Sequence, residues 1–219
     1  MNTKARKIPI NEIFQSIQGE GRNAGVPSVF VRVAGCNLRC EWCDTKYSLR
    51  ADDADYMGIS DLTERINVFN SSHIVVTGGE PLLYQRELSH FFSALSAETY
   101  IEVETNGTIK PESAFDNCVS LYNVSPKLDE AGGINPDAIN FFRDMSSRAD
   151  FKFVYYPRIE DKLRKFISTN QIERQQIYIM PLTHGNMKVQ KGIIKKALDF
   201  CLKSKYRFSP RLQVAYSFR

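Results

Sequence analysis

The chain has 219 residues, of which 42% are hydrophobic, and its formal net charge is +4 at pH 7. This length and apolar fraction favour one domain spanning residues 1–219 over two small ones. The charge is too small to indicate a nucleic-acid partner by itself. The sequence contains no run of about 18 apolar residues, the length that a membrane-spanning helix needs. The first ten residues lack the apolar region of a secretory signal, so we expect a cytoplasmic protein with reduced cysteines.

Segments with strand composition alternate along the chain with segments of helical periodicity. Apolar, β-branched-rich runs predict strands at residues 28–35, 73–79, 100–105, 120–126, 151–156, 176–181 and 206–216. Helical spacing of apolar residues predicts helices at 60–69, 84–96, 135–145, 157–168 and 187–204, with 46–59 as a loop. Ser60 or Asp61 should cap the first helix, and Asn135, before Pro136, the third. The alternation indicates an α/β fold with about six to seven mostly parallel strands.

The least ordinary residue combinations all follow predicted strands. They are GCNLRCEWCDT (35–45), TGGEP (77–81), ETNGT (104–108), SPK (125–127) and MPLTH (180–184). In parallel α/β folds, ligands bind at the carboxyl ends of the strands, where these loops converge. We therefore expect the five loops to form one site, because residues with only structural roles would be scattered over both ends of the sheet.

Three of the five cysteines lie in the first of these loops. The spacing C-x3-C-x2-C is formed by Cys36, Cys40 and Cys43. Thiolates hold iron–sulfur clusters, usually four to a [4Fe–4S] cube, so three would leave one iron with an exchangeable position. The alternative is zinc with His73 or His184 as a fourth ligand, although neither histidine belongs to a ligand pair. We expect Cys118 and Cys201 to be small core or interface residues.

The order of the motifs resembles the radical S-adenosylmethionine (SAM) superfamily, in which C-x3-C-x2-C follows the first strand and Gly-Gly-Glu-Pro the second. This resemblance implies a partial, TIM-like β/α barrel. It also implies a [4Fe–4S] cluster whose open iron chelates SAM and whose electron cleaves it to a 5′-deoxyadenosyl radical. The electron would come from a flavodoxin or a similar one-electron reductant.

Residues 12–45 resemble, almost throughout, the opening of the 7-carboxy-7-deazaguanine synthase family, and ETNGT and VSPK resemble its later motifs in the same order. The resemblance is strong from Glu12 to about Lys127 and weaker beyond. It implies a lyase of queuosine-type biosynthesis that contracts 6-carboxy-5,6,7,8-tetrahydropterin to 7-carboxy-7-deazaguanine with loss of ammonia. It also implies Mg2+, a homodimer, and no catalytic side chain beyond the cofactor-borne radical.

Several residues suit a flat pterin that carries one carboxylate. Gln18 precedes Gly19, and Glu20 stands between Gly19 and Gly21, glycines that allow close approach of the backbone. Arg32 is a charge in an apolar strand, so we expect it to pair with the substrate carboxylate, with a structural salt bridge as the alternative. Further substrate contacts implied by the resemblance are Ile17, Gly19, Thr77 and Arg219.

The resemblance also implies a SAM-binding surface and one magnesium ligand. Gly78 and Gly79 would let the SAM amino group approach the backbone. Thr45 would hold Mg2+ together with substrate oxygens, unless its hydroxyl only caps the turn on a backbone amide. The other implied SAM contacts are Trp42, Asp44, Glu104, Ser125, Pro126, Lys127, Met180, Pro181, Leu182 and Thr183.

The C-terminal part departs from the family pattern. Met180 replaces a usual Gln, Gln213 falls where the last strand usually carries His, and Arg219 is the terminal residue. Two other functions are possible: a radical SAM activating enzyme that acts on a partner protein's glycine, and a zinc-stabilised nucleic-acid-binding module that uses basic residues 188–211. IQGEG and the Asp-Thr after the cysteines favour the synthase over the first, and iron would exclude the second.

Overall fold

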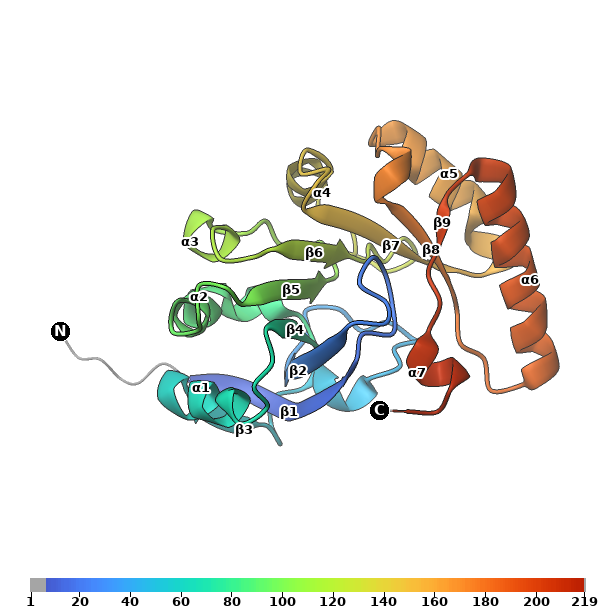
Figure 1. Cartoon of the computed structure of the whole chain (residues 1–219). Helices are drawn as coiled ribbons and strands as arrows, with labels where there is room; N and C mark the ends of the chain where they lie inside the picture. The colour runs from blue at the N-terminus through green and yellow to red at the C-terminus, as the bar shows by residue number, and fades with distance from the viewer. Residues whose placement is uncertain (1–6, 219) are drawn as a thin grey trace.

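The computed structural model describes residues 7–218, which form a single curved sheet with helices packed against it (Figure 1). The strand order is β3-β1-β2-β4-β5-β6-β7-β8-β9, so the described strands form a nine-stranded sheet. Every pairing from β2 to β9 is parallel, whereas β1 pairs antiparallel with both β2 and β3. The strands are β1 Lys7–Ile17, β2 Pro27–Val33, β3 Asp55–Gly58, β4 His73–Gly78, β5 Tyr100–Thr105, β6 Leu121–Val124, β7 Ala149–Tyr155, β8 Ile177–Pro181 and β9 Arg207–Phe208.

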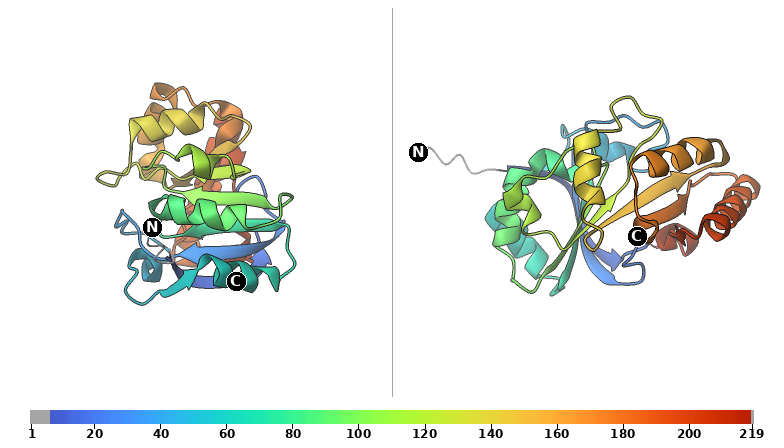
Figure 2. Two further views of the ribbon diagram at one scale, coloured as in Figure 1. Left: turned by 90° about the vertical axis from the view of Figure 1, so that its left-hand side faces the viewer. Right: turned by 90° about the horizontal axis from the view of Figure 1, so that it is seen from above.

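The helices α1 to α6 line one side of this sheet and leave the other side for the site, where the short helix α7 lies (Figure 2). The helices are α1 Ile59–Asn67, α2 Gln85–Ser93, α3 Ser113–Asp116, α4 Pro136–Arg143, α5 Glu160–Thr169, α6 Met187–Ser204 and α7 Leu212–Ala215. Short 3₁₀ turns lie at Lys46–Leu49, Pro81–Tyr84, Pro157–Ile159 and Arg174–Gln176. Because β3 and β9 each have one neighbour, the sheet does not close, and the predicted α/β class with a partial barrel is confirmed. No helix within residues 7–218 is long and apolar enough to cross a membrane.

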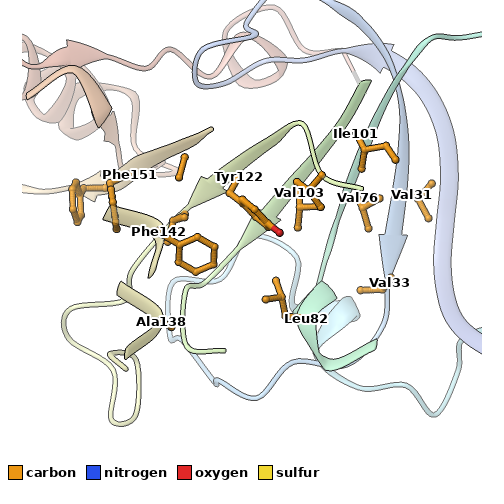
Figure 3. Close-up of a cluster of buried hydrophobic side chains, with 14 of the residues drawn as sticks. Val31, Val33, Val76, Leu82, Ile101, Val103, Tyr122, Ala138, Phe142 and Phe151 are labelled. Atoms are coloured by element: carbon orange, nitrogen blue, oxygen red, sulfur yellow. The ribbon is translucent and has the colours of Figure 1, made fainter. Parts of the chain in front are cut away.

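Alternation along the parallel strands separates the core from the site. Val31, Val76, Val103, Tyr122 and Phe151 point toward the helices and pack with residues such as Leu82 and Phe142 (Figure 3). Side chains one position away point to the opposite face, because successive residues of a strand alternate. These are the polar residues Arg32, Thr77, Glu102, Glu104, Asn123 and Lys152. The strands therefore bury an apolar face under the helices and present a polar face to the interior of the barrel.

Four expectations about the elements were wrong, and one cap was confirmed. The strand β1 was not predicted, and residues 46–59 contain β3 as well as a loop. The predicted strand at 206–216 is only two residues of strand followed by α7, because Pro210 has no N–H for a ladder. Helix α1 begins after Gly58 without a side-chain cap, so neither Ser60 nor Asp61 caps it. The Asn135 side chain does accept from the Asp137 N–H and caps α4.

Candidate active site

One cavity of about 840 Å³ lies at the carboxyl ends of the parallel strands. All five loops that the sequence singled out contribute to its wall or support it. The predicted residues that line it are Ile17, Gln18, Gly19, Glu20, Arg32, Cys40, Trp42, Cys43, Asp44, Thr45, Thr77, Gly78, Gly79, Glu104, Ser125, Lys127, Met180, Pro181, Leu182 and Thr183. Side chains far apart in the sequence are thus brought to one enclosed space, as the motif positions predicted.

Three predicted site residues have a different location. Cys36 is not among the residues that line the cavity, and its sulfur accepts from the Asn106 amide at 3.9 Å. Pro126 faces a separate small depression beside Trp42. Arg219 lies outside the described residues, so its predicted substrate contact is not placed.

The cysteine loop offers sulfur ligands in a setting that fits a cluster. The Cys36 sulfur accepts a hydrogen bond from the Leu38 N–H at 3.4 Å, a contact that stabilises thiolate. Burial raises the pKa of Cys40 to about 11 and also raises the pKa of Cys36. At neutral pH these thiols need a bound cation to become thiolates, and metal loading would release their protons.

A single zinc ion fits less well. Its ligands must all lie about 2.0–2.3 Å from one centre, whereas a cluster distributes its thiolates over different irons. Within residues 7–218, no three His, Cys, Asp or Glu side chains form a group for one metal ion. His73 starts β4 and bonds to Glu102, and exposed His184 accepts from the Asn186 N–H. Cys201 is buried in the hydrophobic core, and the partly buried Cys118 packs against the same core, as expected.

The glycine turn after β4 is fitted against the backbone of the cysteine loop. Gly79 donates its N–H to the Val33 carbonyl at 3.0 Å, and Glu80 donates to the Gly35 carbonyl at 2.8 Å. A Cβ at Gly79 would overlap the Gly35 carbonyl, and one at Gly78, where φ is +124°, would overlap Val33. Close approach of two loops, rather than a simple turn, therefore requires both glycines.

A buried carboxylate joins this turn to the next loop. The Glu80 side chain accepts from the Thr105 hydroxyl at 2.8 Å and from the Asn106 N–H at 2.7 Å. Asn106 in turn donates through its amide to Asn37 in the cysteine loop at 2.9 Å. The TGGEP, ETNGT and cysteine motifs are thus parts of one hydrogen-bonded unit, and this explains why they occur together.

Thr45 has a hydroxyl that is available to a ligand. Its side chain makes no capping hydrogen bond to the following 3₁₀ turn, so the alternative role as a turn cap is wrong. The hydroxyl lies 3.7 Å from the Cys43 sulfur, and the residue lines the cavity. The Lys127 ammonium stands beside the cysteine loop, 5.3 Å from the centre of the Trp42 ring, and donates to the Ser125 hydroxyl at 2.7 Å. Burial lowers the pKa of Lys127.

Arg32 already has an acidic partner. Its Nε donates to Glu12 Oε1 at 2.6 Å, and the Tyr47 hydroxyl donates to the same oxygen at 2.8 Å. Both members of the ion pair line the cavity. The salt bridge that the sequence left open as an alternative is therefore present, and a substrate carboxylate would have to share the guanidinium with Glu12.

The IQGEG loop carries a carboxylate, Glu20, that is held by two cations. Glu20 Oε2 lies 2.5 Å from the Lys152 ammonium, and Glu20 Oε1 accepts from Arg211 at 3.1 Å and from Gln213 at 2.7 Å. Burial alone would raise the pKa of Glu20, but attraction by the two cations outweighs it and lowers the pKa to about 2. Glu20 is therefore a carboxylate at every physiological pH.

The C-terminal segment closes the open side of the barrel on this loop. The Leu212 N–H donates to the Gly19 carbonyl at 3.1 Å, and the Ser209 hydroxyl accepts from the Gly21 N–H at 2.9 Å. Arg211 also bonds to Asp44 and to Thr183, which ties the segment to the cysteine loop and to the loop after β8. Gln213, at the position of the family's usual histidine, lies on a short helix and holds Glu20.

Sequence reasoning missed several residues of this wall. Lys152 and Arg211 were not predicted, nor was the layer beneath, where buried Glu102 accepts from Gln18 at 2.6 Å and from Asn123 at 2.5 Å. The signal for Lys152 was present, since a lone Lys in the apolar run FKFVYY resembles the pattern that identified Arg32. Glu102 and Glu104 alternate with apolar residues in the same way. Nothing in the sequence pattern indicated that Arg211 folds back onto residue 20.

Comparison with known proteins agrees with this site. The Radical SAM superfamily model matches residues 30–123. The 7-carboxy-7-deazaguanine synthase of Pyrobaculum aerophilum is 37% identical over 95% of this chain and 94% of that protein, and the one of Hyperthermus butylicus is 34% identical over 98% and 93%. The crystal structure of QueE from Escherichia coli, at 24% identity, has a TM-score of 0.70 and covers 93% of both chains, which shows a shared fold.

The open parallel barrel with a three-cysteine loop and a glycine turn at its mouth defines a radical SAM enzyme. This class uses a [4Fe–4S] cluster and SAM. Because relatives above 30% identity match nearly the whole length, the chain belongs to the 7-carboxy-7-deazaguanine synthase family. The partner-protein activating enzyme and the zinc-stabilised nucleic-acid module are not favoured.

Proposed function

We propose that this chain converts 6-carboxy-5,6,7,8-tetrahydropterin to 7-carboxy-7-deazaguanine with loss of ammonia. The observation that carries the proposal is that the IQGEG side chains and the cysteine loop face one cavity. A flat substrate held by Gln18 and Glu20 would then lie within reach of a cofactor bound at the cysteines. The test is anaerobic incubation of reconstituted enzyme with SAM, Mg2+, dithionite and the pterin, with the loss of pterin and the product followed by chromatography. Unchanged pterin would contradict the proposal.

The chain's own residues have separable tasks in this proposal. Cys36, Cys40 and Cys43 hold the cluster, and the backbone at Gly78 and Gly79 leaves room for SAM. When bound, these cofactors supply the radical that initiates the reaction. Trp42, Asp44, Ser125, Lys127 and the loop Met180, Pro181, Leu182 and Thr183 surround the adenosyl end in this proposal. The Gln18 amide and the Glu20 carboxylate orient the pterin, with the backbone of Ile17 and Gly19 close to its ring.

Thr45 is the proposed protein ligand of Mg2+. Two observations support this role: the Thr45 hydroxyl makes no capping hydrogen bond to the following turn, and the residue lies on the cavity wall two positions after Cys43. Mg2+ prefers hard oxygen ligands and would tie substrate oxygens to the loop that carries the cluster. We expect Thr45→Val to retain cluster and SAM binding but to lose most of the stimulation of turnover by added Mg2+. Thr45→Ser should keep it. An equal Mg2+ response in Thr45→Val and the parent would show that the ion is held elsewhere.

Arg32 is the proposed partner of the substrate carboxylate. Its guanidinium has further N–H groups beyond the one that Glu12 occupies, so it can bind a second anion. We expect Arg32→Ala to raise the KM for the pterin at least tenfold, since a charge-assisted hydrogen bond contributes about 1.5–3 kcal/mol. Steady-state kinetics measures this, with SAM binding and iron content as integrity checks. If the variant instead loses its fold and cluster, the pair with Glu12 is structural and the substrate role fails.

The proposal also covers the compartment, the electron donor and the oligomeric state of the enzyme. A cluster held by reduced thiols requires a reducing compartment, so we place the enzyme in the cytoplasm. A flavodoxin-type protein or a similar one-electron donor is the proposed reductant. We propose a homodimer, since symmetric dimers are the commonest assembly of soluble enzymes. Light scattering on the reconstituted protein tests the dimer.

A further inference from the structure

Lys152 is a buried cation inside the barrel with two acidic partners. It lies in the middle of β7 and is 4% exposed. Its ammonium is 2.5 Å from Glu20 Oε2 and 3.3 Å from Glu104 Oε1. A lysine is rarely buried unless it is paired, and this one bridges two carboxylates from different parts of the chain. All three side chains line the cavity.

The two carboxylates depend on Lys152 to different degrees. Glu20 has a second cation, Arg211, at 3.1 Å. Glu104 has Lys152 as its cationic partner and otherwise accepts from Thr77 at 2.7 Å and, at 3.5 Å, from Gln18. The other charged groups that face Lys152 are Glu102 on β5 and Lys127 after β6. Without Lys152, no cation would stand between Glu20 and Glu104, and the like charges of the two carboxylates would repel each other.

The charge state of these carboxylates matters to a pterin. Each still has acceptor capacity, because an ionised carboxylate accepts about four hydrogen bonds and fewer are made here. A tetrahydropterin presents N–H donors on both rings, and only an ionised carboxylate accepts from them with both oxygens. Burial alone would lower the pKa of Lys152, but Glu104 and Glu20 raise it above its ordinary value. The cation therefore persists across the physiological range.

We propose that Lys152 is a positioning residue for substrate binding: its ammonium bridges Glu20 and Glu104, so that the two carboxylates stand side by side and accept N–H groups of the pterin. This inference rests on the proposed function. Lys152 touches the carboxylates rather than the reacting atoms, so its effect is on the affinity for the pterin and not on SAM.

The decisive experiment is a comparison of the KM and kcat for the pterin between Lys152→Met and the parent enzyme. Loss of the bridging cation leaves Glu20 and Glu104 without the group that holds them together, so KM should rise at least tenfold while kcat changes less. Lys152→Arg should restore a KM close to that of the parent, because a guanidinium can bridge the same two carboxylates. Lys195→Met, which replaces an exposed lysine on α6, is the matched control and should keep the KM of the parent.

Two further variants keep the test decisive. Glu104→Gln replaces one of the two carboxylates by an amide, so it should also raise KM. The double variant Lys152→Met/Glu104→Gln removes both charges, should fold even if Lys152→Met does not, and should show the same KM as Glu104→Gln. SAM binding by equilibrium dialysis should be unchanged in Lys152→Met and Lys152→Arg.

Three outcomes would overturn the inference. They are a KM of Lys152→Met near that of the parent, a raised KM that Lys152→Arg does not restore, and a double variant whose KM differs clearly from that of Glu104→Gln. Failure of the proposed function is recognised separately, because the parent enzyme would then neither bind nor convert the pterin.

Discussion

Replacing Cys36, Cys40 or Cys43 by Ala, one at a time, should yield protein that holds no stable [4Fe–4S] cluster and cleaves no SAM. Each cysteine supplies one of three thiolates, and a cube with two protein ligands has no defined open iron for SAM. The parent should contain about four iron and four sulfide per chain after anaerobic reconstitution. Iron and sulfide analysis, together with 5′-deoxyadenosine formation under dithionite, measures the loss.

Cys118→Ala and Cys201→Ala provide the matched controls, because they remove the thiols outside the loop. Both should keep iron and SAM cleavage. Cys201 lies in the core, so its replacement should cost some stability without changing the cluster. Full SAM cleavage by Cys40→Ala protein would refute the assignment of the loop.

Gly79→Ala should impair the enzyme nearly as much as the loss of one cluster cysteine. The new methyl group would overlap the carbonyl of Gly35, and the obstacle is backbone rather than a flexible side chain. Either the cysteine loop or the turn must move, which should disrupt SAM binding and cost several kcal/mol, more than the roughly 0.5–3 kcal/mol of an ordinary substitution. Equilibrium dialysis with SAM on reconstituted protein and thermal unfolding of the protein measure the two effects.

Gly192→Ala is the control for this substitution. Gly192 lies within α6, and a Cβ there meets nothing within 4 Å. Alanine at an exposed helical position should stabilise the protein by about 0.5–1 kcal/mol and leave SAM binding unchanged. If Gly79→Ala behaves like Gly192→Ala, the tight packing of the two loops is not needed for the site.

The sequence motifs predicted the cysteine and glycine loops well because their chemistry is local. Three cysteines within eight residues need one loop, and the glycine pair needs one turn. The mostly parallel α/β sheet followed from alternating strand and helix patterns, and the partial barrel from the resemblance to the radical SAM superfamily. The strands near the edge of the sheet were harder to predict. β1 contains Pro9, Asn11 and Glu12, which weaken a strand signal, and it pairs antiparallel with both of its neighbours, β2 and the edge strand β3.

The charged interior could not be predicted as a network. Lys152, Glu20 and Glu104 are distant in sequence, and their pairing depends on the strand order, which leaves only β6 between β5 and β7, and on the loop after β1. Arg211 joins them only because the chain turns into α7 after Pro210 instead of continuing as a strand. A charge in an apolar strand predicts that a partner exists, but the partner's identity comes from the three-dimensional fold.

The most direct test of the central proposal is the product balance of the reconstituted enzyme. Anaerobic incubation with SAM, Mg2+, dithionite and 6-carboxy-5,6,7,8-tetrahydropterin should give 7-carboxy-7-deazaguanine and ammonia in equal amounts, identified by mass spectrometry and an ammonia assay. Reactions with Cys40→Ala protein, or without SAM, should give neither product. Formation of 5′-deoxyadenosine while the pterin remains intact would contradict the account, since the chain would then be a radical SAM enzyme with another substrate.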